Sequence, residues 1–143
     1  MRKMICLFAA IFMTAAMASA EDLGLFSANP YDIESSSNAF GKGSPFSQNS
    51  INNPFGPYGS PFSNWSATNP FATDAPRLYD QEGNYRGKLS ANPYEADSTS
   101  NPFGRYGSPL SPDSINNQLG AGSPYRYDSP NNPYGKGSRL EGK

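Results

Sequence analysis

Residues 74–90 read Asp74-Ala75-Pro76-Arg77-Leu78-Tyr79-Asp80-Gln81-Glu82-Gly83-Asn84-Tyr85-Arg86-Gly87-Lys88-Leu89-Ser90. This is the longest segment after residue 20 without an Asn-Pro or Ser-Pro pair. Two short apolar runs flank a polar Asp-Gln-Glu-Gly sequence, a pattern that predicts a β-hairpin around residues 77–89. Asp80 and Gly83, at the first and last turn positions, favour a type I turn that closes onto a left-handed glycine. We expect Leu78, Tyr85 and Leu89 to share one face of the hairpin.

The first twenty residues have the three parts of a secretory signal peptide. Residues 1–3 include Arg2 and Lys3, residues 4–17 are almost wholly apolar, and residues 18–20 are small. This layout predicts a signal helix that is removed by cleavage after Ala20. The apolar stretch is shorter than the roughly 20 residues that span a bilayer, so no stable membrane span is expected after cleavage. The predicted location is periplasmic or secreted.

Several kinds of chemistry are disfavoured by the residues that the chain lacks. It contains no His, and its single Cys, Cys6, lies within the predicted signal. Neither a Ser-His nor a Cys-His pair can therefore form, and a metal site would depend on oxygen ligands alone. The carboxylates do not follow the spacing of a calcium-binding loop. We therefore expect a protein that is not an enzyme and that uses no cofactor and no metal.

The composition after residue 20 is typical of low-complexity, weakly ordered chains. Pro, Gly, Ser and Asn make up about half of these residues, and aliphatic residues are few. Little apolar surface is then available to offset the loss of chain entropy, although the aromatic content is high. The charges are dispersed and nearly balanced, at a net −1 for the whole chain. This balance predicts no nucleic-acid partner.

The chain also contains an internal duplication. Ser27-Ala28-Asn29-Pro30-Tyr31 returns 63 residues later as Ser90-Ala91-Asn92-Pro93-Tyr94, and the similarity continues toward the C-terminus. Repeats of this kind define the architecture before individual elements do. The predicted organisation is a signal peptide (1–20), a first repeat arm (21–73), a central β-hairpin (74–89), a second repeat arm (90–136) and a C-terminal tail (137–143).

Within each arm a smaller unit recurs: Ser-Pro-aromatic, then a Ser, then Asn-Pro-aromatic-Gly. Asn, Pro and Gly at these positions are residues that form tight turns. Turns this frequent leave no room for a helix, and the prolines prevent most sheet pairing. The fold class predicted is mostly irregular, with turn and polyproline-like repeats and one short hairpin. The arms are expected to form a flexible string of turns or, alternatively, a compact repeat in which each turn presents an aromatic to its neighbour.

These units resemble those of small exported bacterial repeat proteins. The resemblance rests on residues 101–109 (Asn-Pro-Phe-Gly-Arg-Tyr-Gly-Ser-Pro) and residues 111–117 (Ser-Pro-Asp-Ser-Ile-Asn-Asn), and it covers most of the chain after residue 20. It implies a bacterial exported protein and no particular activity.

Spaced aromatic side chains on a polar chain can stack on sugar faces or on one another. They predict a structural or multivalent interaction role at the bacterial envelope, with envelope polysaccharide, peptidoglycan or a protein as partner. The alternatives are a soluble binder of a small ligand or calcium, and a chain that folds on a protein partner. A further alternative is that the rings only pack within the chain. The aromatics proposed for interaction are Tyr31, Phe55, Tyr58, Trp65, Phe71, Tyr94, Phe103, Tyr106, Tyr125 and Tyr134.

Overall fold

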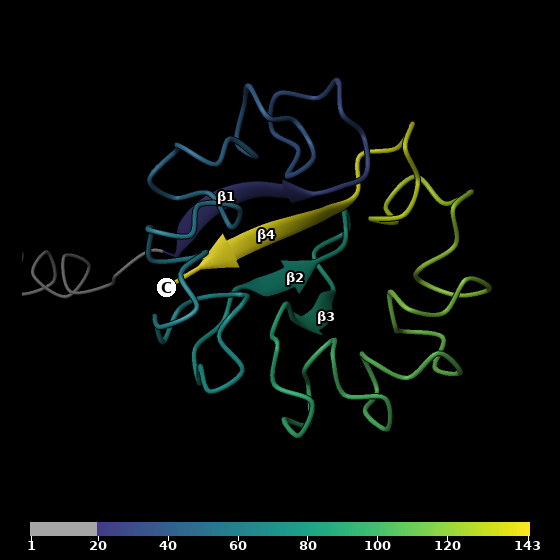
Figure 1. Ribbon diagram of the computed structural model, residues 1–143. Coiled ribbons are helices and arrows are strands. Elements are labelled where there is room, and N and C mark those ends of the chain that lie inside the picture. Colours follow the sequence, from purple (N-terminus) through teal and green to yellow (C-terminus); the bar gives the residue numbers. More distant parts are fainter. Residues whose placement is uncertain (1–19) are drawn as a thin grey trace, which may run out of the picture.

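A computed structural model describes residues 20–143. The predicted signal peptide, including Cys6, lies outside the described residues except for Ala20. The described part of the chain forms four strands, which Figure 1 shows at the centre of the molecule with the arms looped around them. These strands are β1 (Glu21–Phe26), β2 (Arg77–Tyr79), β3 (Tyr85–Lys88) and β4 (Ser138–Gly142).

The central hairpin is confirmed. Strands β2 and β3 pair antiparallel, and the intervening turn closes by a bond from Gly83 N to Asp80 O of 3.1 Å. Gly83 has the expected positive φ of 90°. Leu78 lies in the core and Leu89 packs against it. Tyr85 instead pairs with Tyr79, which points to the opposite face from Leu78 because neighbouring strand residues alternate.

The hairpin is only half of the sheet. The strand order is β1-β4-β2-β3, with every pair antiparallel. The prediction of a single hairpin was therefore incomplete: the start of the first arm forms β1, and the predicted tail forms β4, one of the two central strands. Figure 1 shows that these segments, at opposite ends of the described chain, lie side by side.

The duplication seen in the sequence is a duplication of structure. One half runs β1, first arm, β2, and the other runs β3, second arm, β4. The pair Asp22–Glu141 in β1 and β4 corresponds to the pair Tyr85–Tyr79 in β3 and β2. Each half therefore pairs its first strand with the last strand of the other half. Neither half can complete the four-stranded sheet alone.

The outer edges of the sheet are covered by the arms in the same way in both halves. Leu25 forms a parallel bridge with Ser35, and Lys88 forms one with Ser98. Covering edge strands removes the unpaired backbone groups that promote aggregation.

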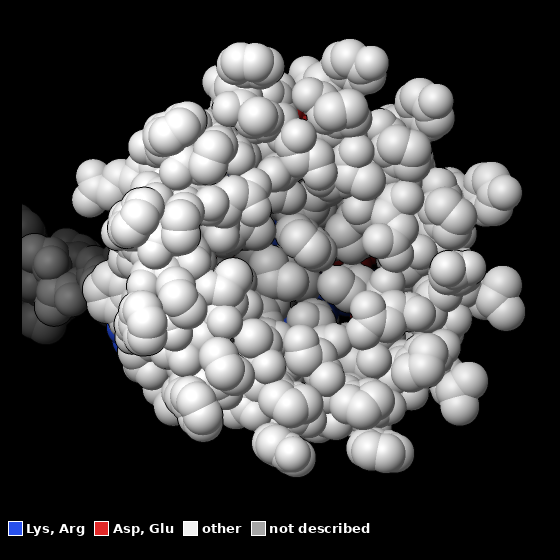
Figure 2. Space-filling model, in the orientation of Figure 1, with Lys and Arg blue, Asp and Glu red and all other residues white. Residues whose placement is uncertain are grey.

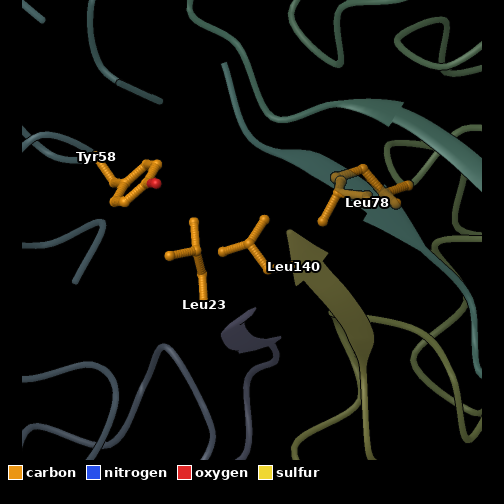
Figure 3. Close-up of a cluster of buried hydrophobic side chains, with 5 residues drawn as sticks. Leu23, Tyr58, Leu78 and Leu140 are labelled. Atoms are coloured by element: carbon orange, nitrogen blue, oxygen red, sulfur yellow. The ribbon is translucent and has the colours of Figure 1, made fainter. Parts of the chain in front are cut away.

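A small hydrophobic core lies on one face of the sheet. Leu23, Leu78 and Leu140 from the strands meet Tyr58 and Ile115 from the arms, and Figure 3 shows Tyr58 together with the three leucines. The Tyr58 hydroxyl donates to Lys143 O at 2.9 Å. Burial of these side chains is the main apolar contribution to stability.

The arms consist of consecutive turns with a three-residue period. In the first arm Ser35 N bonds to Asp32 O, Asn38 N to Ser35 O, and Gly41 N to Asn38 O, and the pattern continues in both arms. The residues where turns meet are mainly Ser, Asn and Gly, which suit the ends of type I turns.

The prediction that the chain forms no helix is confirmed for residues 20–143. This part of the chain accordingly has no helix that is long and apolar enough to cross a membrane.

Serine takes the place of aliphatic residues in the interior of the arms. One serine in each repeat is at most 2% exposed, and its hydroxyl accepts a bond from the backbone N two residues later. A turn whose hydrogen bonds are satisfied locally can be buried without a large apolar core. These serines are Ser35, Ser50, Ser66, Ser98, Ser114 and Ser129.

Successive repeats are joined by asparagine side chains. Asn116 Nδ2 donates to Thr99 O at 2.8 Å and to Gly107 O at 3.0 Å. Asn131 makes the corresponding two bonds one repeat later, both of 2.9 Å. Hydrogen bonds therefore connect the turns along the arm as well as within each turn.

Candidate interaction surface

The outer surface of both arms carries a regular series of apolar side chains, here called the tip residues. Each is the third residue of a turn whose first residue is Asn or Ser, and each is 85–97% exposed. Figure 2 shows side chains projecting all around the outline of the molecule. The tip residues are Tyr31, Phe40, Phe46, Phe55, Phe62 and Phe71 in the first arm, and Tyr94, Phe103, Leu110, Leu119, Tyr125 and Tyr134 in the second.

The turns that begin with Asn are fixed by both ends of the amide side chain. Asn53 Oδ1 accepts a bond from Phe55 N at 2.9 Å, and Asn53 Nδ2 donates to Ser47 O at 2.9 Å. The intervening Pro54 fixes φ at the second turn position. The backbone of Phe55 is therefore held in place while its ring stays in solvent.

The turns that begin with Ser use the hydroxyl in the same way. Ser44 Oγ accepts a bond from Phe46 N at 3.1 Å, and Ser108 Oγ accepts one from Leu110 N at 3.1 Å. Fixed turns that carry exposed side chains lose little further backbone freedom on binding, which favours affinity.

Two neighbouring tip residues enclose an apolar notch. A hollow of about 360 Å³ lies between Phe46 and Phe55 and is lined also by Pro45, Pro54 and Asn53. Both polar ends of the Asn53 side chain are already bonded within the turn. The notch therefore offers apolar contact and few free hydrogen-bonding groups.

Most of this surface is uncharged. On the face shown in Figure 2, the visible atoms belong almost entirely to residues other than Lys, Arg, Asp and Glu.

A network of charges lies where the hairpin meets the second arm: Arg86 bonds Asp80 Oδ2 at 2.9 Å and Asp113 Oδ1 at 2.8 Å. The hydrogen bond from Arg105 to Asp113 helps to lower the pKa of that carboxyl, although burial opposes it.

The buried Asp80 is a structural carboxylate. Burial by itself raises the Asp80 pKa, but bonds from Asn84, Arg86 and the Glu82 backbone outweigh it and lower the pKa below its ordinary value. With all of these donors directed at it, the carboxylate fixes the hairpin turn and holds Arg86.

Seven of the ten aromatics predicted for interaction are tip residues. The other three lie elsewhere: Tyr58 is buried in the core, Trp65 is 39% exposed and stacks on Tyr58, and Tyr106 packs against Tyr85. The prediction omitted five tip residues, Phe40, Phe46, Phe62, Leu110 and Leu119. Their position two residues after the Asn or Ser of a turn is the signal that could have identified them.

Among residues 20–143, no three His, Cys, Asp or Glu side chains lie close enough together to hold a metal ion. No protein-family model matches this chain, and no curated protein and no solved structure matches it either.

Proposed function

We propose that this chain is an exported bacterial protein, without enzymatic activity, that acts through multivalent contacts at the cell envelope. Export is supported by the signal-like pattern of residues 1–20. The absence of His and the placement of Cys6 in that segment support a role other than catalysis.

The observation that carries the proposal is the exposure of the tip residues. They are 85–97% exposed, whereas the chain buries leucines and serines in its interior. Large exposed apolar patches mark interaction sites, and the tip residues Phe46 and Phe55 border one apolar hollow. A single aromatic contact contributes only about 0.5–1.5 kcal/mol beyond its burial. Many such contacts on one polymer or assembly bind together far more tightly than any one alone.

The partner proposed is a repeating surface such as peptidoglycan or envelope polysaccharide, or an envelope protein. A repeating partner suits this chain because its exposed tip residues recur along both arms in turns of similar local structure, as at Phe55 and Phe103. The uncharged character of the shown face favours contacts by stacking and apolar burial over ion pairing.

Retention on purified peptidoglycan and envelope fractions tests the proposal. Phe→Ser substitutions are introduced at two, four and six tip residues of a variant series. Because these side chains are exposed, folding should be unaffected, while retention should fall more steeply than in proportion to the number removed. Ile33→Ser and Tyr127→Ser are matched controls, since both residues are 64% exposed but are not tip residues. Unchanged retention after removal of six tips would refute the proposal.

A further inference from the structure

A groove lies over β1 and β4, on the face of the sheet opposite the hydrophobic core. Its volume is about 510 Å³, which is within the range of small-molecule sites. Side chains of both charges line it, and two of the lining residues, Arg139 and Glu141, form an ion pair. The lining residues that matter below are Asp22, Gly24, Glu34, Arg139 and Glu141.

The other half of the molecule shows what fills the corresponding space there. The pair Asp22–Glu141 corresponds to the pair Tyr85–Tyr79 in the sheet register. The rings of Tyr79 and Tyr85 pack against each other in a tilted arrangement, with 5.7 Å between their centroids. The second half therefore places aromatic rings where the first half has two shorter carboxylates and a groove.

The residues around the β1–β4 groove also correspond to those around the Tyr79–Tyr85 ring pair in the other half. Gly24 lies against Glu34 O and the Lys42 side chain, and Gly87 lies against Asp97 O and the Tyr106 side chain. Leu25 N bonds Glu34 O at 2.7 Å, as Lys88 N bonds Asp97 O at 2.8 Å. Tyr106 completes the aromatic cluster, 5.4 Å from Tyr85.

The ring of Tyr85 is held by a hydrogen bond as well as by its tilted and edge-on contacts with Tyr79 and Tyr106. Its hydroxyl donates to Asp97 Oδ2 at 2.5 Å. Burial and this bond raise the pKa of Tyr85, so the hydroxyl keeps its proton as a donor. Glu34, the residue that corresponds to Asp97, borders the groove. The first half therefore keeps a carboxylate at the acceptor position and lacks the phenol.

We propose that the β1–β4 groove binds a phenol ring, with its hydroxyl donating to the Glu34 carboxylate as Tyr85 donates to Asp97. Arg139 borders the groove and already lies 5.6 Å from the centre of the Tyr79 ring. Its guanidinium can contact a second ring from the groove side. This site is separate from the tip residues and does not depend on the function proposed for them.

The phenol can come from a free tyrosine-like molecule or from a tyrosine of a second copy of this chain. The chain itself exposes such groups, since Tyr31, Tyr94, Tyr125 and Tyr134 are 88–92% exposed. Both sources supply the same ring and the same hydroxyl donor.

Titration of the purified chain with N-acetyl-tyrosinamide, followed by amide NMR, tests the proposal. Saturable shifts are expected at Gly24, Leu25 and Glu34, with binding of N-acetyl-phenylalaninamide about tenfold weaker or more, because it cannot donate to the carboxylate. Absence of saturable shifts at these amides, or equal binding of the two ligands, would overturn the proposal.

Variants based on the other half sharpen the test. Asp22→Tyr introduces the ring found at Tyr85 and should abolish ligand binding, whereas Asp22→Asn should retain it because it leaves the groove open. Glu34→Gln should weaken tyrosinamide binding about tenfold and leave the phenylalaninamide unaffected. This last variant decides the matter if Asp22→Tyr does not fold. Unchanged tyrosinamide binding in Glu34→Gln would contradict the assigned contact.

Sedimentation over a range of concentrations separates the two sources. Self-association that Asp22→Tyr removes and Asp22→Asn retains assigns the phenol to a second copy. A monomer at every concentration that still binds tyrosinamide assigns it to a free ligand or another protein.

Discussion

Leu78 lies directly opposite Leu140 in the central strand pair, and the two residues hold corresponding positions in the two halves of the chain. Each follows an arginine, Arg77 or Arg139, and each is at most 1% exposed. The pair β2–β4 thus joins a duplicated structure at its centre, where each half completes the sheet of the other.

This relationship predicts that the two leucines contribute similarly to stability. Leu78→Ala and Leu140→Ala should each lower the free energy of unfolding by about 2–5 kcal/mol, because each leaves a cavity in the same small core. Leu119→Ala is the control, since Leu119 is 97% exposed and its loss should cost less than about 0.5 kcal/mol. Urea unfolding measures all three. A severe effect at one leucine and none at the other would contradict the symmetric arrangement.

The close packing of the turns predicts that particular glycines cannot be replaced. A Cβ at Gly122 would collide with Ile115 O, so Gly122→Ala should destabilise the chain by several kcal/mol or prevent folding. Gly83 has open space around a Cβ position and a φ of 90°. Because Asn tolerates this conformation comparatively well, Gly83→Asn should cost only about 1 kcal/mol. Thermal melting distinguishes the two, and equal melting temperatures would show that the turns are not packed as described.

The asparagines that begin the turns should contribute through both ends of their side chains. Asn101 Nδ2 donates to Glu95 O at 3.0 Å, and its Oδ1 accepts from Phe103 N at 3.0 Å. Asn101→Ala should therefore cost about 1–3 kcal/mol, and Asn101→Asp, which keeps only the acceptor, should cost less. Gln118→Ala, at an exposed position, is the control. Urea unfolding of the three variants should give Asn101→Ala the lowest free energy of unfolding, Asn101→Asp an intermediate value and Gln118→Ala the highest. An Asn101→Ala variant as stable as Gln118→Ala would contradict the role given to the Asn101 side chain.

The ion-paired carboxylates predict sensitivity to acid. The pKa values of Asp74, Asp80 and Asp113 are lowered in the folded chain. Below about pH 4 the unfolded chain takes up protons that the folded carboxylates still exclude, so stability falls as the pH decreases through the lowered pKa values. The stabilisation is fully present at neutral pH. Melting temperatures between pH 7 and pH 2 check this, and a constant value below pH 4 would disagree with it.

The duplication and the hairpin could be predicted from the sequence because both depend on local signals. The repeat that relates Ser27 to Ser90 can be read directly from the amino-acid sequence. The residues Asp80 and Gly83 themselves favour the turn that joins the two hairpin strands. Strands β1 and β4 could not be predicted in the same way. The segment Glu21–Phe26 is brief and irregular in pattern, and its partner lies at the far end of the chain. Nothing local reveals such a pairing.

The outward orientation of the rings was one of two alternatives that the sequence left open, for a different physical reason. Aromatic residues usually supply the core of a domain, so a compact form of the arms was expected to pack them against each other. Hydrogen bonds from Ser and Asn side chains instead hold the turns together, as at Ser114 and Asn116. With the turns held in this way, the aromatic at each turn is left to face solvent.

The central claim is that the arms are ordered turns and not a mobile string, and amide hydrogen exchange by NMR tests it most directly. We predict wide dispersion across both arms, with protected amides at Ser35, Asn38 and Gly41 and at the corresponding Ser98, Asn101 and Gly104, where backbone hydrogen bonds recur every three residues. Narrow dispersion with unprotected amides outside the four strands would contradict the account. The tip residues would then lack the fixed turns on which the proposed function depends.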